Sequence, residues 1–175
     1  MNKLPCLDKG YIACLDSTGS STKLKDIAME FFKKTDTAFL TGLSSLTVVM
    51  KCPLFVQLHL STYGLQIIAV PPTGEIDAYC PNAGEVGAPE HDINKAIADS
   101  IASTTDALLI NPKAYQHDGC NRFVSQIMTP VNTYTTIIVH GSYSDWRKFS
   151  YQSNLPSAIA AYAKVIQQIM TAEWR

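Results

Sequence analysis

The stretch from Leu46 to Gly64 constrains the fold most, because a strand pattern is followed at once by a helix pattern. Residues 46–50 form a short apolar run rich in β-branched side chains, which predicts a buried strand. Pro53 suits the first position of a helix, where its missing N–H is not needed, and Gly64 suits a position just beyond the helix end. The apolar side of this helix is expected to comprise Leu54, Phe55, Leu58 and Leu60.

Three more segments have the pattern of strands. They are residues 11–15, 65–70 and 134–140, which are rich in β-branched and other apolar side chains. The sequence Asp16-Ser17-Thr18-Gly19 predicts a turn after the first of them. Residues 75–90 are rich in glycine and proline and predict a loop that includes a short strand at 76–79.

Three further segments have the pattern of helices. One is capped by Ser20 or Ser21, a second begins at Asp92 and runs to about residue 109, before Pro112, and the last begins at Pro156. The positions expected on their apolar sides are Leu24, Ile27, Ala28, Phe31 and Phe32 in the first, Ile93, Ala96, Ile97, Ser100 and Ile101 in the second, and Ile159, Tyr162, Ile166 and Ile169 in the last.

Length and composition limit the class of protein. The 175 residues suffice for one domain with a substantial core, so we predict a single domain over 1–175. A net charge of −1 and a pI near 6.4 give no sign of a nucleic-acid surface. No apolar stretch could span a bilayer or serve as a signal region, so we expect no membrane association and a cytoplasmic location. The five cysteines form no CxxC pair, which favours reduced thiols over a zinc site or a disulfide framework.

Four blocks of the sequence resemble the flavin-dependent thymidylate synthases, also called thymidylate synthase complementing proteins. In order, they read LDKGYIACLDSTG at 7–19, KCPLFV at 51–56, PVNTYT at 130–135 and GSYSDWRKF at 141–149. The resemblance extends from Leu7 to about Ile169. It implies an α/β (α+β) fold with a central, mostly antiparallel sheet flanked by helices. It also implies self-association, because the proteins of this family are homotetramers with active sites between subunits.

The residues with which this family binds its pyrimidine nucleotide are missing from the aligned positions. In the register set by KCPLFV, the family's Arg-Gln pair and Arg-His-Arg triplet fall on Leu58, His59, Thr62, Tyr63 and Gly64. The polar and charged residues of its last helix fall on Ser153, Ile159, Ala161 and Ala163, and Leu43 takes the place of a histidine ahead of the central strand. The chain has only three arginines, whereas a site for a nucleotide and a dinucleotide flavin ordinarily uses several.

The polar side chains that remain in this pocket are candidates for nucleotide binding. They are His59, Tyr63 and Gln126, and His59 and Tyr63 can equally serve as packing residues. No catalytic residue is assigned, and the sequence contains no HxH, HExxH or glycine-rich phosphate motif, so no metal site is predicted.

Other polar features have ordinary structural interpretations. His91 and His117 each precede an aspartate and are expected in solvated turns or caps, and His140 ends a strand without a sequence partner. Residues 17–21 could hold an anion at a helix N-terminus, or could form an ordinary capped turn.

The loss of every aligned arginine removes the electrostatic stabilisation that the family's chemistry needs. The sequence therefore predicts a catalytically degenerate homologue retained as a structural or assembly scaffold. Two alternatives stay open: a nucleotide-binding or sequestering protein, and a flavin-dependent methyltransferase of the thymidylate synthase type acting on deoxyuridylate. No cofactor is expected, with FAD the cofactor if the ancestral pocket survives.

The expected partners follow from the same resemblance. They are other copies of this chain, in a tetramer as in the family, or a hetero-complex with a paralogue or with virion proteins. Because members of this family are frequent in phage genomes, a viral origin would place the protein in the host cytoplasm or in the virion.

Overall fold

The computed structural model describes residues 2–19, 21–33, 43–70, 76–86, 91–117 and 129–174. The chain divides into two compact units, which are treated separately. The first comprises Met1–Cys52, Val56–Pro71 and Thr135–Arg175, and the second comprises Pro53–Phe55 and Pro72–Tyr134. That residues 1–175 act as a single domain stays a prediction.

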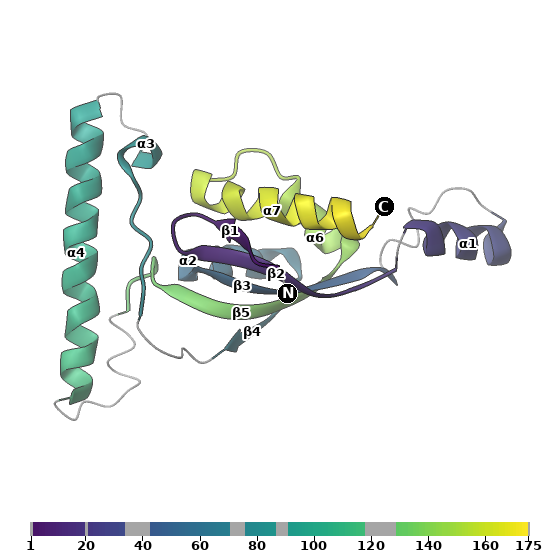
Figure 1. Ribbon diagram of the computed structural model, residues 1–175, viewed down its shortest axis with the longest axis horizontal. Coiled ribbons are helices and arrows are strands. Elements are labelled where there is room, and N and C mark those ends of the chain that lie inside the picture. The colour runs from purple at the N-terminus through teal and green to yellow at the C-terminus, as the bar shows by residue number, and fades with distance from the viewer. Residues whose placement is uncertain are drawn as a thin grey trace. The chain divides into compact units, whose positions relative to one another are not determined.

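The first unit is built on a five-stranded sheet with the strand order β1-β2-β3-β5-β4 (Figure 1). The strands are β1 (Leu4–Cys6), β2 (Gly10–Thr18), β3 (Ser45–Pro53), β4 (Gln66–Val70) and β5 (Tyr134–Ser142). The pairs β1–β2, β2–β3 and β4–β5 are antiparallel. With its flanking helices, this sheet confirms the α+β fold class predicted from the sequence.

One face of the sheet forms the core of this unit. Along β3 from Ser45 to Cys52, the residues at even positions are fully buried and those at odd positions are half-buried, as the period of two in a strand requires. Helices α2 (Leu54–Leu60), which continues as the 3₁₀ helix η2 (Ser61–Tyr63), and α6 (Tyr143–Ser150) each follow a strand directly, and α7 (Ser157–Glu173) follows α6. Helix α7 lies along β1 and β2 (Figure 1).

The apolar stripe predicted on the last helix is confirmed, and its residues are buried within this chain. Ile159, Tyr162, Ile166 and Ile169 are all buried, and Tyr162 Oη donates a hydrogen bond of 2.9 Å to the carbonyl of Lys51. The stripe therefore packs within this unit and is no argument for a subunit contact. The prediction of a homo-oligomer has to rest on other surfaces.

Several predictions for this unit were wrong in detail. Strand β2 continues through the predicted turn to Thr18, because an irregularity between Cys14 and Asp16 keeps it paired with β3. Pro53 ends β3, and the helix begins one residue later. Leu58 is exposed, and the buried residues of α2 are Val56 and Leu60.

The first helix, α1 (Ser21–Phe32), confirms the predicted segment. Ala28 is buried as expected, whereas Phe31 is exposed, so the predicted apolar side is only partly covered.

The second unit holds two helices, α3 (Ala83–Val86) and α4 (His91–His117), which contact each other. Helix α4 extends past the predicted end and includes Pro112. A proline costs a helix one backbone hydrogen bond, but its own φ of about −65° is helical. Ile93 and Ile97, predicted on the buried side of α4, are exposed.

The predicted loop between residues 75 and 90 contains the short helix α3. The strand predicted at 76–79 is wrong, since among these residues only Ala78 forms a bridge, to Thr133. No helix in the described ranges combines the length and apolar character needed to cross a bilayer.

Candidate functional site

Two of the three predicted nucleotide-binding residues lie side by side at the end of α2. His59 belongs to the last turn of α2, and Tyr63 ends η2, one helical turn further on. Residues four apart on a helix face the same way, and here Tyr63 Oη lies 3.0 Å from His59 Nε2. The two rings meet edge to face, with centroids 5.3 Å apart.

A glutamine and a phenylalanine complete this cluster from a distant part of the sequence. Tyr63 Oη donates a hydrogen bond to Gln152 Oε1, just beyond the end of α6. The buried ring of Phe149 in α6 packs against both rings, with centroids 5.5 Å from Tyr63 and 6.4 Å from His59. We call these four residues the His59–Tyr63 cluster. Its polar groups bond to one another, which is the arrangement of packing residues.

Sequence reasoning missed Gln152 and Phe149, because nothing local pairs them with a helix about ninety positions earlier. The third candidate, Gln126, lies outside the described residues. His59 and Tyr63 are thus brought together, and the position of Gln126 is not tested.

The other positions aligned with nucleotide-binding residues carry no charge. Thr62 Oγ1 donates to the backbone carbonyl of His59, and Gly64 has a left-handed backbone with φ of +75°. On α7, Ile159 and Ala163 are buried in the core. These side chains stabilise helix ends and packing, and none can hold a phosphate by charge.

A shallow concavity of about 550 Å³ adjoins the cluster through Gln152. Its lining residues are Ser144, Arg147, Lys148, Tyr151, Gln152 and Ser153. The Arg147 guanidinium lies 6.0 Å from the centre of the Tyr151 ring, and Arg147 is the only arginine in the described part of the chain. Two cations, an aromatic ring and hydroxyl groups could together take an anionic aromatic ligand.

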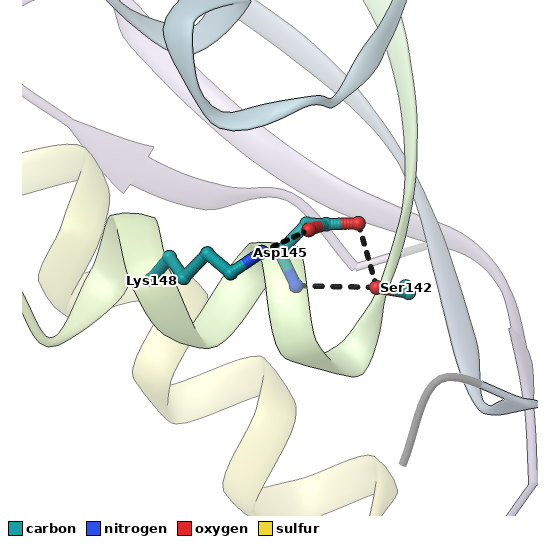
Figure 2. A network of polar contacts seen from close by, with 3 residues as sticks. All are labelled: Ser142, Asp145 and Lys148. Atoms are coloured by element: carbon teal, nitrogen blue, oxygen red, sulfur yellow. Dashed lines mark hydrogen bonds and ion pairs between the residues drawn. The ribbon is translucent and has the colours of Figure 1, made fainter. Parts of the chain in front are cut away.

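Helix α6, which carries Phe149 and leads to Gln152, is fixed at its start by a polar network (Figure 2). Ser142 is the N-cap: its Oγ accepts a 3.2 Å hydrogen bond from the Asp145 N–H and donates one of 2.6 Å to Asp145 Oδ2. Lys148 Nζ lies 2.9 Å from Asp145 Oδ1. The hydrogen bond from Ser142, with the nearby Lys148 ammonium, holds the pKa of Asp145 below its usual value of 3.8.

Ser142→Ala is expected to lower the free energy of unfolding by about 1 kcal/mol, because it removes the N-cap of α6. Ser144→Ala, two residues further on and without a capping role, is the control and should change stability by less than about 0.5 kcal/mol. Urea titration followed by far-UV circular dichroism measures both. Equal losses from the two variants would contradict the capping role of Ser142.

The same network predicts a pH dependence. A carboxyl group whose pKa is lowered by folding stabilises the folded state above its unfolded pKa, and this contribution is lost as the pH falls through the folded pKa. Asp145→Asn should therefore flatten the decline of stability below pH 3.8. Urea midpoints across the acidic range test this, and parallel curves for the two proteins would contradict it.

Tyr63→Phe is expected to lower the free energy of unfolding by about 0.5–1.5 kcal/mol, because the hydroxyl that joins His59 and Gln152 is removed. Tyr151→Phe is the matched control, since Tyr151 is exposed and lies outside the cluster. Thermal unfolding distinguishes them: the first variant should melt about 1–6 °C lower, and the second should melt with the wild type. If Tyr63→Phe melts with the wild type, the hydrogen bonds of the Tyr63 hydroxyl contribute nothing to stability.

The position that aligns with a histidine of the flavin-dependent thymidylate synthases, ahead of the central strand, gives no support for a flavin site. Leu43 is exposed there, Ser44 Oγ donates a 3.2 Å hydrogen bond to the Gly19 carbonyl, and Ser45 Oγ lies 2.8 Å from Thr18 Oγ1. Residues 43–45 thus offer FAD no cation, and the hydroxyls on which a contact would depend are bonded within the chain. Of the residues described at this place, 43–45 do not fit the group.

The remaining polar candidates also have structural roles. His140 Nδ1 lies 2.8 Å from Thr47 Oγ1 on the sheet, and the side chains of His91 and His117 lie outside the described residues. Ser17 Oγ donates to the Glu173 carboxylate, which would repel an anion, so the structure argues against the anion site considered at residues 17–21. No group of potential metal ligands occurs among the described side chains.

The described cysteines are free thiols, as predicted. Cys6 and Cys52 are buried, and burial raises the pKa of both thiols, that of Cys6 to about 12. Thiols with raised pKa values are poor nucleophiles at neutral pH.

Comparison with known proteins supplies a fold and no family. No protein-family model matches the chain, and no curated protein matches it significantly in sequence. Among solved structures, the UMP/dUMP methylase PolB from Streptomyces cacaoi, bound with 5-Br UMP, is similar, with a TM-score of 0.78 and 15% sequence identity. The likeness covers 97% of this chain and 93% of that chain. The chain therefore has a thymidylate synthase-like fold, that of a nucleotide methylase.

Proposed function

We propose that the protein is a catalytically degenerate relative of the nucleotide methylases, retained as a structural or assembly scaffold. The fold likeness to a UMP/dUMP methylase over 97% of the chain supports the relation. The positions that align with nucleotide-binding residues of the flavin-dependent thymidylate synthases carry uncharged side chains, which supports the loss of methylase activity. A fold can outlast its chemistry, because packing residues and site residues are separate sets.

The His59–Tyr63 cluster is the observation that carries this proposal. In a working pocket, polar side chains keep hydrogen-bonding capacity for the ligand. Here Tyr63 Oη is shared between His59 and Gln152, and Phe149 covers the two rings. A nucleotide would have to break these contacts and would gain no aligned arginine in return.

Thermal unfolding with a panel of UMP, dUMP and 5-bromo-UMP tests the proposal. Ligands that bind only the folded state raise its melting temperature. We expect no shift with any of the three at millimolar concentration. A shift that Tyr63→Phe abolishes would show that the cluster binds nucleotide and would overturn the scaffold role.

The shallow concavity that adjoins the His59–Tyr63 cluster through Gln152 supports a second candidate function, the binding or sequestering of a nucleotide. Arg147 and Lys148 could hold a phosphate there, and Tyr151 could stack on a base. In this case the melting shift would be lost in Arg147→Ala and Lys148→Ala, and would be kept in Tyr63→Phe. The presence of a shift in the wild type therefore separates nucleotide binding from the scaffold role, and the variants that abolish the shift show which site binds the nucleotide.

Flavin-dependent methyl transfer to deoxyuridylate is the third possibility, and we propose that the protein holds no FAD. The bonded hydroxyls of Ser44 and Ser45 support this. After addition of excess FAD and desalting, the visible absorption spectrum of the purified protein should contain no flavin absorbance. Flavin absorbance that stays with the protein would contradict this proposal and would favour a flavin-dependent methyltransferase.

A scaffold needs partners. Those we propose are further copies of this chain, a paralogue, or virion proteins if the protein is viral.

A further inference from the structure

The two edges of the five-stranded sheet differ in a way that points to a partner. Edge strands expose unpaired backbone N–H and C=O groups, and proteins protect them with short strands, proline or lysine. Strand β1 has three residues, contains Pro5 and follows Lys3. Strand β4 has five residues, Gln-Ile-Ile-Ala-Val, with no charge and no proline. Among the residues that the structure describes, β4 is thus the edge strand that carries none of these protective features.

The side chains of β4 extend an apolar row across the face of the sheet opposite the buried even positions of β3. Ile68 pairs with Ile138 on β5, and Ala13 on β2 pairs with Val49 on β3. The contact between Thr47 and His140 shows that these positions share a face, because each lies two residues from Val49 or Ile138. The row ends at Ile68, which is 64% exposed.

We propose that β4 pairs antiparallel with β4 of a second copy, which joins two five-stranded sheets into one across a two-fold axis at Ile68. This register places Ile68 opposite Ile68 of the partner subunit, and Gln66 opposite Val70 of the partner subunit. Because the axis is perpendicular to the sheet, equivalent faces adjoin, and the apolar row continues from one copy into the other.

The features of β4 fit its own copy in particular. The strand carries no charge that would attract an acidic or a basic peptide, and an uncharged strand meets its copy without like-charge repulsion. The sequence places Pro71 and Pro72 directly after it, and proline cannot donate to a ladder. Pairing is therefore limited to about the five residues of β4, the length that its own copy supplies.

Sedimentation equilibrium of the full chain, with one matched pair of variants, tests this proposal. We expect wild-type dimers, and Ile68→Lys should raise the dissociation constant at least tenfold, because two lysines would face each other at the axis. Ile110→Lys on α4 is the control, since Ile110 is also 64% exposed, and it should leave the dissociation constant unchanged. Both sites are exposed, so both variants should fold, which circular dichroism checks. A monomeric wild type, or an Ile68→Lys variant that dimerises like the wild type, would overturn the proposal.

Cysteine cross-linking tests the register. Directly opposed residues of antiparallel strands have Cα atoms about 4.5–5.5 Å apart, within the range that a disulfide spans. Ile68→Cys should therefore give a covalent dimer on mild oxidation. Gln66→Cys should not, because two residues at position 66 would lie four positions apart along the strand, about 13 Å. Equal cross-linking of the two variants would exclude this register. Neither test depends on nucleotide binding, so the dimer and the proposed function can fail separately.

Discussion

Trp146→Ala is expected to lower the free energy of unfolding by about 3–5 kcal/mol, the largest loss that we predict for one substitution. Trp146 is fully buried, and its Nε1 donates a 3.0 Å hydrogen bond to the backbone carbonyl of Leu46. Its ring also meets Phe149, with centroids 6.4 Å apart. The substitution leaves a large cavity beside β3 and withdraws support from the His59–Tyr63 cluster.

The matched control is the chain's other tryptophan. Trp174 is half-buried at the end of α7, where its Nε1 donates to the Thr18 carbonyl at 3.3 Å and its ring meets Tyr143. Trp174→Ala should cost less than half as much, because less apolar surface is buried. Guanidinium titrations compare the two variants. A loss below about 1 kcal/mol for Trp146→Ala would mean that this core is not packed as described.

Gly10→Ala is expected to destabilise the sheet by about 1–3 kcal/mol or more, although it adds a single methyl group. A Cβ atom at this position would lie 2.6 Å from the Cys6 carbonyl oxygen and 2.9 Å from that of Lys51, and would meet Tyr162 Oη. Two of these three atoms are backbone, so the strands themselves would have to move apart.

Gly84→Ala in α3 is the control for this effect. The nearest atom to a Cβ there is Asn82 Oδ1 at 3.2 Å, a side-chain atom that can shift, and alanine favours a helix over glycine. We expect a change within about 0.5 kcal/mol. Combining Gly10→Ala with Tyr162→Phe should cost less than the sum of the two, because the hydroxyl that meets the new methyl group is absent. Full additivity would show that Tyr162 and Gly10 are not in contact.

Much of the fold could be predicted because its signals are local. The β-branched run before KCPLFV lies in β3, and the residues after Pro156 form α7. The antiparallel sheet with helices was instead implied by the resemblance of four motif blocks to the flavin-dependent thymidylate synthases, and the structure confirms it. The errors have physical causes. Strand β2 continues through Asp16-Ser17-Thr18, which resemble a turn, because its pairing with β3 shifts register between Cys14 and Asp16. Helix α4 includes Pro112, which lacks the N–H for one backbone hydrogen bond.

The candidate site was predictable only in part, because half of it depends on tertiary contacts. His59 and Tyr63 are four residues apart in helical sequence, so their proximity follows from helix geometry. Gln152 and Phe149 join them through the packing of α6, which no local pattern reveals. Sequence also could not show that the apolar stripe of α7 would be buried within its own chain.

One measurement tests the loss of activity most directly. The purified protein would be incubated with dUMP, a methylene-bearing folate, FAD and reduced nicotinamide dinucleotide phosphate, and the mixture would be analysed for dTMP by liquid chromatography. A thymidylate synthase of known activity, in the same mixture, serves as the positive control. Our account predicts no dTMP above the protein-free blank. Formation of dTMP in proportion to the amount of this protein would contradict it and would show that the chain is an enzyme.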